Sequence, residues 1–369
     1  MDIQVTELSK IYSGNVSALN GVSFHIDHNG IFALIGKNGA GKTTLVRILS
    51  TQLMPTSGRA FINGNDVVQD AREVREIIAA VPQEARAVPW MTPVQTITSY
   101  LMWRGYTHSE SRTMAMDVLR SLGLEDQENV KNRSLSGGQK RKVLVATALA
   151  SEATVIFMDE PTTGLDFISR KELWNVLASM KKDRLIILTT HYLEEAEQLG
   201  DRIGIIDHGR MVGLGTLEDL RGLTRYPLSL KIFARNLDMP DIMGQVKRLD
   251  DGEIQVLTTE DQAYGLVTSL LASHIRFNVQ EISLNTIFES LVQGGVNGEW
   301  ECGQPDIRFN PCKFHLCHGK LSCDSEKYPA GTSVNTGCGD ICKPRDTPAG
   351  GCRGGAYNEH GIKRDIHAG

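Results

Sequence analysis

Three features are scarce in this chain of 369 residues: cysteine before residue 302, long apolar runs and surplus positive charge. All seven cysteines lie between Cys302 and Cys352, and the long segment without cysteine suits a reducing compartment. No run of 18 or more apolar residues occurs, so no transmembrane helix is predicted. The first residues lack the basic and apolar regions of a signal peptide. The net charge of −5 argues against nucleic acid as a partner, because nucleic-acid-binding proteins usually carry a basic surplus.

The most informative segment is glycine-rich and reads GKNGAGKTT. It fits the phosphate-binding loop pattern of glycine, four residues and then Gly-Lys-Thr. It follows the apolar run 31–35, which predicts a buried strand, and precedes 45–49, which predicts a helix. The glycines let backbone N–H groups converge on phosphate oxygens, and the helix N-terminus adds partial positive charge. The expected nucleotide-binding residues are Gly36, Asn38, Gly39, Gly41, Lys42, Thr43 and Thr44.

Within this loop, two side chains have distinct expected roles. We expect Lys42 to reach the β- and γ-phosphates, and the Thr43 hydroxyl to bind Mg²⁺.

Further apolar runs, separated or preceded by helical segments, occur at 154–158, 185–188 and 202–206. Continuous apolar strands alternating with helices predict an α/β fold with a mostly parallel sheet covered on both faces.

An acidic pair follows one of these predicted strands. Asp159 and Glu160 come directly after the apolar run 155–158. This position puts both carboxylates at the carboxyl edge of the sheet, where such folds bind their ligands. We expect Asp159 to bind Mg²⁺, directly or through water, and Glu160 to polarise an attacking water as a general base.

Between the loop and the acidic pair lies Leu-Ser-Gly-Gly-Gln at 135–139, followed by a predicted helix. In this order and spacing, the three motifs resemble the ATP-binding-cassette (ABC) family, with its P-loop NTPase fold. Physically the segment is a second anion site, because Ser136 and the amides of Gly137 and Gly138 stand at a helix start. The resemblance implies that these residues and Gln139 contact ATP held by the opposite subunit.

Four further positions match this family one by one. Tyr12 resembles the aromatic residue that stacks on adenine, and Gln83 resembles the glutamine that links Mg²⁺ to a helical subdomain. Asp166 resembles the acidic residue of a loop at the dimer interface, and it also suits the N-cap of the following helix. The residue after it is Phe167, where the family often has proline. His191, after the run 185–188, resembles the histidine that senses the γ-phosphate.

The resemblance covers about residues 1–220, with an antiparallel β subdomain and a helical subdomain at about 84–150. In the latter, Ser109 is expected to be the N-cap of a helix over 109–122. Residues 221–295 alternate between short strands and helices, including a helix at 241–249, and predict a small accessory α/β domain.

The tail 296–369 is rich in cysteine and glycine and shows no period of helix or strand. Three interpretations stay open: a metal module, a disordered extension, or a non-native peptide outside structural selection. The candidate metal ligands are Cys312, His315, Cys317, His318 and Cys323. The absence of a Cys-x-x-Cys pair and the odd number of cysteines argue against the metal module.

One set of motifs per chain implies that two ABC subunits, identical or different, sandwich two ATP molecules. The resemblance therefore implies an ATPase subunit of a membrane transporter, with an exporter favoured. It would lie peripherally on the cytoplasmic face of the cell membrane and drive integral membrane permease subunits. The alternative from another class is a soluble ABC ATPase that acts as an assembly or regulatory factor.

Overall fold

The computed structural model describes residues 1–233, 245–249 and 253–293. The candidate metal ligands of the tail lie outside the described residues, as do residues 241–244 of the predicted helix at 241–249. Within the described part, no helix has both the length and the hydropathy needed to cross a membrane.

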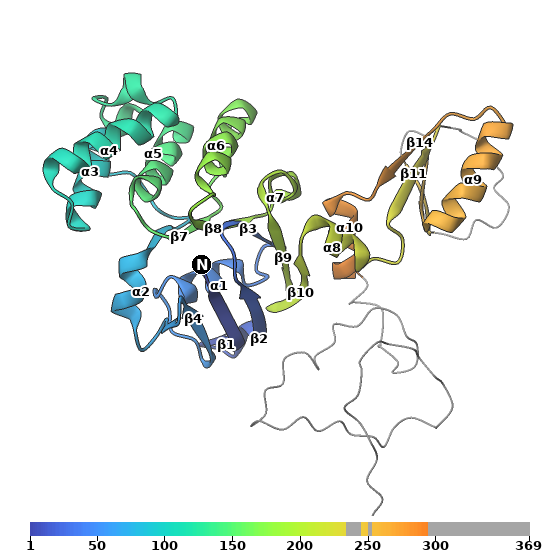
Figure 1. The fold of residues 1–369 in the computed structure, drawn as a ribbon, viewed down its shortest axis with the longest axis horizontal. Coiled ribbons are helices and arrows are strands. Elements are labelled where there is room, and N and C mark those ends of the chain that lie inside the picture. The colour runs from blue at the N-terminus through green and yellow to red at the C-terminus, as the bar shows by residue number, and fades with distance from the viewer. Residues whose placement is uncertain (234–244, 250–252, 294–369) are drawn as a thin grey trace, which may run out of the picture. The chain divides into compact units, whose positions relative to one another are not determined.

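A central six-stranded sheet organises the first part of the chain (Figure 1). Its order is β10-β9-β3-β8-β7-β6, and only the edge strand β10 is antiparallel to its neighbour. The strands are β3 (Gly30–Ile35), β6 (Ile78–Val81), β7 (Val155–Asp159), β8 (Leu185–Thr190), β9 (Arg202–Asp207) and β10 (Arg210–Gly215). The predicted α/β fold with a mostly parallel sheet is confirmed.

Both faces of this sheet are covered, which explains why its strands are continuously apolar. In β3, Ile31 and Ala33 enter one core, whereas Phe32 and Leu34 enter the other. Successive side chains of a strand point to opposite faces, so a strand between two cores needs apolar residues at every position. Phe32 stacks on Phe24 with ring centroids 5.8 Å apart, which fixes the second layer against the sheet.

The second layer is an antiparallel sheet in the order β2-β1-β4-β5, the β subdomain that the sequence predicted. The helices α1 (Lys42–Leu49) and α2 (Ala71–Ile77) also contribute to the core on this face. The strands are β1 (Ile3–Tyr12), β2 (Val16–Ile26), β4 (Ser57–Ile62) and β5 (Asn65–Asp66).

Helices cover the other face. α3 (Pro93–Trp103), α4 (His108–Ser121) and α5 (Gly137–Ala150) lie together, and α5 also contacts β6 and β7 (Figure 1). Two short 3₁₀ turns, Glu125–Gln127 and Asn132–Ser134, connect α4 to α5.

Two further helices of the first part of the chain are α6 (Phe167–Met180) and α7 (Leu193–Leu199). Both contribute buried residues to the same core as α3, α4 and α5. α7 also contacts β3 and β8, so it joins the central sheet as α5 does.

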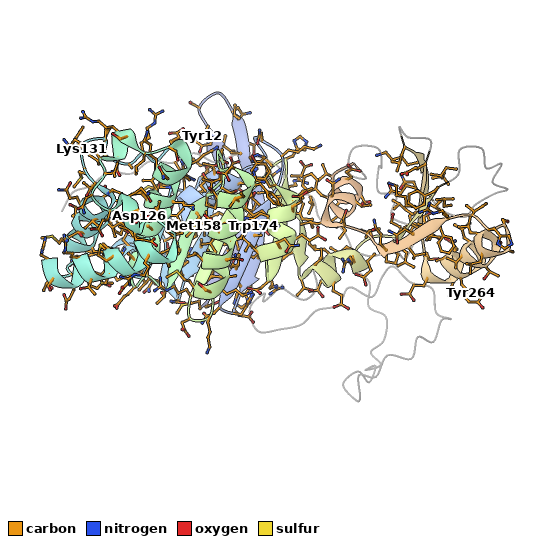
Figure 2. All side chains as sticks on the ribbon, turned by 90° about the horizontal axis from the view of Figure 1, so that it is seen from above. Tyr12, Asp126, Lys131, Met158, Trp174 and Tyr264 are labelled. Carbon is orange, nitrogen blue, oxygen red and sulfur yellow. The ribbon has the colours of Figure 1, made fainter. Side chains whose placement is uncertain are left out.

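After α8 (Leu217–Gly222) the chain forms an antiparallel sheet in the order β12-β13-β11-β14. Its elements are β11 (Leu228–Ile232), β12 (Gln245–Arg248), β13 (Ile254–Thr258), α9 (Glu260–Ala272) and β14 (Phe277–Glu281). α9 packs on β11 through a small core of its own, and Tyr264 projects from α9 with 79% of its surface exposed (Figure 2). The predicted helix at 241–249 is wrong in its described residues, because Gln245–Arg248 pairs with β13.

The final described helix, α10 (Leu284–Gln293), returns to the first part of the chain and contacts α7, α8 and β10. Leu284 and Ile287 are fully buried in the core that also contains Leu199 of α7. The Arg221 guanidinium binds Glu281 at 2.5 Å and donates to the Ile282 carbonyl at 3.1 Å. This stretch is therefore continuous with the core of the first 220 residues. The domain boundaries drawn from the sequence stay a prediction.

The start of α4 differs from the predicted one. Its N-cap is Thr107, not Ser109. The Thr107 hydroxyl accepts a hydrogen bond from the Glu110 backbone N–H, and the Glu110 carboxylate accepts one from the Thr107 backbone N–H. This capping box satisfies two helix-end donors at once, whereas Ser109 lacks a partner of this kind three residues further on.

We therefore expect Thr107→Ala to lower the free energy of unfolding by about 1 kcal/mol, because it removes the cap. Ser109→Ala is the matched control and should change that energy by less than about 0.5 kcal/mol, since Ser109 is exposed within the helix. Urea denaturation of the two variants measures both values. Equal losses would contradict the assignment of the cap.

Candidate functional site

Loops at the carboxyl ends of the parallel strands come together at one edge of the central sheet. Ile35 lies beside Thr190, and Asp159 lies beside Thr189, in the strand register. The residues that follow these positions are the glycine-rich loop, Glu160 and His191. Segments more than 100 residues apart in sequence thus meet at one place.

The glycine-rich loop has no room for side chains at two of its glycines. A Cβ on Gly36 would lie 2.3 Å from the Ile206 carbonyl oxygen, and one on Gly41 would lie 2.5 Å from the Ala18 carbonyl oxygen. Gly41 also has φ of 111°, a conformation that other residues rarely adopt. Gly41 immediately precedes α1, so the backbone N–H groups of the loop are next to the N-terminus of this helix.

Lys42 is buried in this loop, with 5% of its surface exposed. Its ammonium donates to the Gly36 carbonyl at 2.7 Å and to the Lys37 carbonyl at 3.1 Å. Burial lowers the pKa of Lys42, while the charges of Glu160 and Asp159 act in the opposite direction. The loop therefore holds a cation within electrostatic reach of both carboxylates.

Glu160 occupies a strained turn at the end of β7. Its φ of 50° is left-handed, which costs a residue with a side chain on the order of 1–3 kcal/mol. Its backbone N–H donates to the Thr189 carbonyl at 3.1 Å and to the Thr189 hydroxyl at 3.0 Å. The turn directs the Glu160 side chain away from the two cores and toward the loops at the sheet edge.

Three groups from three loops contact the Glu160 carboxylate. One oxygen accepts from the Gln83 amide at 3.0 Å and from the Thr163 hydroxyl at 3.1 Å. The other oxygen lies 3.2 Å from Nδ1 of His191. The carboxylate group is mostly buried, with 10% of the side chain exposed. These contacts fix its direction, which is what a general base needs if it is to hold one water molecule.

The residues expected to bind Mg²⁺ have the right chemistry for it. Asp159 is buried and accepts a hydrogen bond from the Thr189 hydroxyl. Mg²⁺ prefers oxygen ligands and is usually bound through one or two carboxylates together with substrate phosphates. Among the described residues no cluster of three His, Cys, Asp or Glu side chains could hold a metal alone. The carboxylate of Asp159 and the hydroxyl of Thr43 therefore fit Mg²⁺ that is shared with a nucleotide.

The segment 136–139 forms a separate surface at the start of α5. Ser136 is the N-cap: its hydroxyl accepts from the Gln139 backbone N–H at 3.1 Å, and the Gln139 side chain accepts from the Ser136 backbone N–H at 3.0 Å. Ser136 and Gly137 are exposed, and open space surrounds Gly137. The helix start, with its partial positive charge, thus faces outward on the described chain.

Asp166 and Tyr12 lie outside the contacts around Glu160. Asp166 caps α6, accepting from the Ile168 and Ser169 backbone N–H groups at 3.0 Å, and these bonds, that of Ser169 foremost, lower its pKa. Tyr12, labelled in Figure 2, ends β1, and its hydroxyl lies 3.3 Å from the Thr44 hydroxyl. Tyr12 therefore borders the glycine-rich loop, next to the phosphate site.

Sequence reasoning missed three contributors to the site. Thr163 and Thr189 bind Glu160, and Arg141 donates hydrogen bonds to the backbone at the end of β7. A hydroxyl three residues after a carboxylate in a tight turn is a usable signal for Thr163. Arg141 gave no signal, because an arginine on a predicted helix is usually a surface residue.

A fully buried carboxylate lies behind the site, on α7. Glu195 accepts from the Thr162 hydroxyl at 3.0 Å and from the Trp174 ring N–H at 3.1 Å. Burial raises its pKa above the ordinary value, although these hydrogen bonds and the charge of Arg170 act against that rise. The folded state therefore binds a proton more tightly at Glu195 than the unfolded state does.

This shift predicts a pH dependence of stability. With a raised folded-state pKa, the contribution of Glu195 is fully present below the unfolded pKa and is lost as the pH rises through the folded pKa. As the pH rises above the ordinary glutamate pKa, Glu195→Gln should become more stable relative to the parent by about 1.4 kcal/mol for each pH unit, until Glu195 ionises in the folded state. Urea unfolding across this range tests it, with the exposed Glu194→Gln as control. Parallel stability curves for Glu195→Gln and the parent would contradict the assignment.

The family described as ABC transporter matches residues 19–163, which include the glycine-rich loop, segment 136–139 and Glu160. The daunorubicin/doxorubicin resistance ATP-binding protein DrrA of Streptomyces peucetius is 32% identical over 260 residues. These are 70% of this chain and 77% of that protein.

A second relative is much longer than this chain. The human phospholipid-transporting ATPase ABCA3 is 36% identical over 217 residues, and the match covers 58% of this chain but 13% of ABCA3. A solved structure titled as the ATP binding subunit of an ABC transporter superposes with a TM-score of 0.55 at 30% identity. That match covers 60% of this chain and 92% of that one.

Proposed function

This chain belongs to the ABC transporter family, and from that premise we propose that it hydrolyses ATP to drive the permease subunits of a membrane exporter. The observation that carries the proposal is the carboxylate of Glu160, held by Gln83, Thr163 and His191 at the edge where the glycine-rich loop begins. The name of the relative DrrA favours export, because removal of a drug from the cell is one source of drug resistance.

The residues of this chain divide the work as follows. The loop amides and Lys42 bind the phosphates and compensate their charge, and Tyr12 stacks on the base. Glu160 accepts a proton from the attacking water, and the Gln83 amide and the His191 ring hold its carboxylate in position. Mg²⁺, when bound, neutralises charge on the phosphates, with Thr43 and Asp159 as its protein ligands.

The active unit in this proposal is a dimer. The signature segment 136–139 faces outward and carries the exposed N-terminus of α5, which suits the γ-phosphate of a nucleotide held by a second subunit. In the same proposal Asp166 lies at the dimer interface. The exposed Phe167 and Ile168, which follow it, offer apolar area for that contact. ATP closes the interface, and loss of the γ-phosphate contacts lets it open.

Permease subunits are the proposed partners of this motion. The loop at Gln83 and the helices over about 84–135 form the proposed docking region, since the loop contacts Glu160 on one side and leads into α3 on the other. Such an assembly places the chain peripherally on the cytoplasmic face of the membrane.

Lys42→Ala tests the phosphate site. The variant removes the buried ammonium, so we expect ATP affinity to fall at least 100-fold, or about 2.7 kcal/mol. Isothermal titration calorimetry with ATP and Mg²⁺ measures this loss. Lys37→Ala is the control, because the Lys37 side chain is exposed in the same loop and should leave affinity within about threefold.

Glu160→Gln tests both hydrolysis and the dimer. We expect kcat to fall at least 100-fold, the usual scale for removal of a general base, with ATP binding retained. The variant should then collect as a closed dimer in saturating ATP and Mg²⁺, measured by light scattering. Hydrolysis at the parent rate would contradict the role of Glu160. A monomer under these conditions would contradict the proposal that two subunits bind each ATP between them.

A further inference from the structure

Arg141 is buried inside the first part of the chain, five residues after the N-cap of α5, with 8% of its surface exposed. Within the described residues, its guanidinium donates hydrogen bonds to backbone carbonyl oxygens and forms no direct ion pair with a carboxylate. Every hydrogen bond that the structure gives to the Arg141 side chain ends on one of them. The acceptors are the carbonyls of Asp159 (2.6 Å), Glu160 (2.9 Å), Pro161 (3.2 Å), Pro82 (3.2 Å) and Gln83 (3.3 Å).

These acceptors belong to the two loops that meet at the catalytic carboxylate. Asp159, Glu160 and Gln83 turn their carbonyls toward Arg141, while the side chains of Gln83 and Glu160 bind each other on the other side. The left-handed backbone of Glu160 lies between two of the bonded carbonyls, those of Asp159 and Glu160. Arg141 therefore supports both the strained backbone of Glu160 and the loop that orients its side chain.

We propose that Arg141 is a positioning residue that couples the signature segment 136–139 to Glu160 and Gln83 of the same chain. This inference rests on the proposed function, in which the signature of each chain contacts the ATP held by the other. A shift of α5 when ATP binds to its N-terminus moves the guanidinium, and with it the two loops. Each nucleotide thus sets the geometry of the catalytic carboxylate that serves the other nucleotide.

The planar guanidinium is needed for this coupling. Its fixed fork of donors meets five carbonyls from two directions, whereas a lysine ammonium has three donors on a flexible stem. The carboxylates of Asp159 and Glu160 favour the charged form of Arg141, although burial lowers its pKa. A conservative change to lysine therefore keeps the charge and α5 itself, but it loosens the connection between α5 and the loops.

The test compares Arg141→Lys with Arg184→Lys in the full chain. Arg184 donates to the carbonyls of Leu149 and Ser151 at the C-terminal end of α5. Its replacement therefore removes the same type of hydrogen bond, from an arginine to backbone carbonyls, but far from the signature segment. We expect Arg141→Lys to lower kcat at least tenfold and to reduce the Hill coefficient for ATP toward 1. Its ATP affinity should stay within twofold of the parent, because no phosphate contact is lost. Arg184→Lys should keep the parent's kcat and Hill coefficient.

The alternative results separate this coupling from the proposed function. Parent-like kcat and Hill coefficient in Arg141→Lys would overturn the coupling alone, as would equal losses in both variants. A parent chain without cooperative hydrolysis, together with a monomeric Glu160→Gln variant, would overturn the proposed function and the coupling with it.

A second variant addresses the possibility that Arg141→Lys fails to fold. Arg141→Ala leaves a space that free guanidinium ions fit, and we expect millimolar guanidinium to restore at least part of the lost kcat and Hill coefficient. A purely structural loss would not recover in this way, so absence of rescue in a folded Arg141→Ala chain would overturn the coupling. Circular dichroism establishes folding of each variant, and equal concentrations of sodium chloride control for ionic strength.

Discussion

The left-handed turn that ends β7 at Glu160 is the constraint on which the other contacts depend. A regular strand would point this side chain into one of the two apolar cores that flank the sheet. The turn instead directs it toward Gln83, Thr163 and His191, which come from three different loops. Hydrogen bonds from the Glu160 N–H to Thr189 and from Arg141 to the Glu160 carbonyl hold the turn on both sides.

The fold could be predicted from sequence where each strand lies between two cores. Runs such as 155–158 must then be apolar at every position, and no other common element of that length has this pattern. The accessory sheet packs its small core on one face. Its strands therefore lack a continuous apolar run, and their sequences are harder to distinguish from those of short helices. The error at 241–249 arose there. The N-cap of α4 was misplaced by two residues because threonine and serine both suit that position, and Glu110 decides between them.

The site residues that belong to sequence motifs could be predicted. Lys42, Glu160 and His191 each follow a predicted strand, and parallel strands bring such positions to one edge. Contacts that depend on side-chain direction were not predictable, such as those of Thr163 and Thr189. Arg141 is the extreme case, because a buried arginine bonded only to carbonyls has no partner residue type that a sequence could reveal.

Because α10 packs against α7, α8 and β10, the accessory sheet can change in length more easily than the segments on either side of it. The accessory sheet is bracketed by two segments that share a single interior, since Leu220 before it and Leu284 after it are both fully buried there. It therefore has the topology of an insertion rather than of an appendage. Its strands and loops can lengthen or shrink without exposing that interior, whereas a protein cut off after α8 would present a bare apolar surface to water.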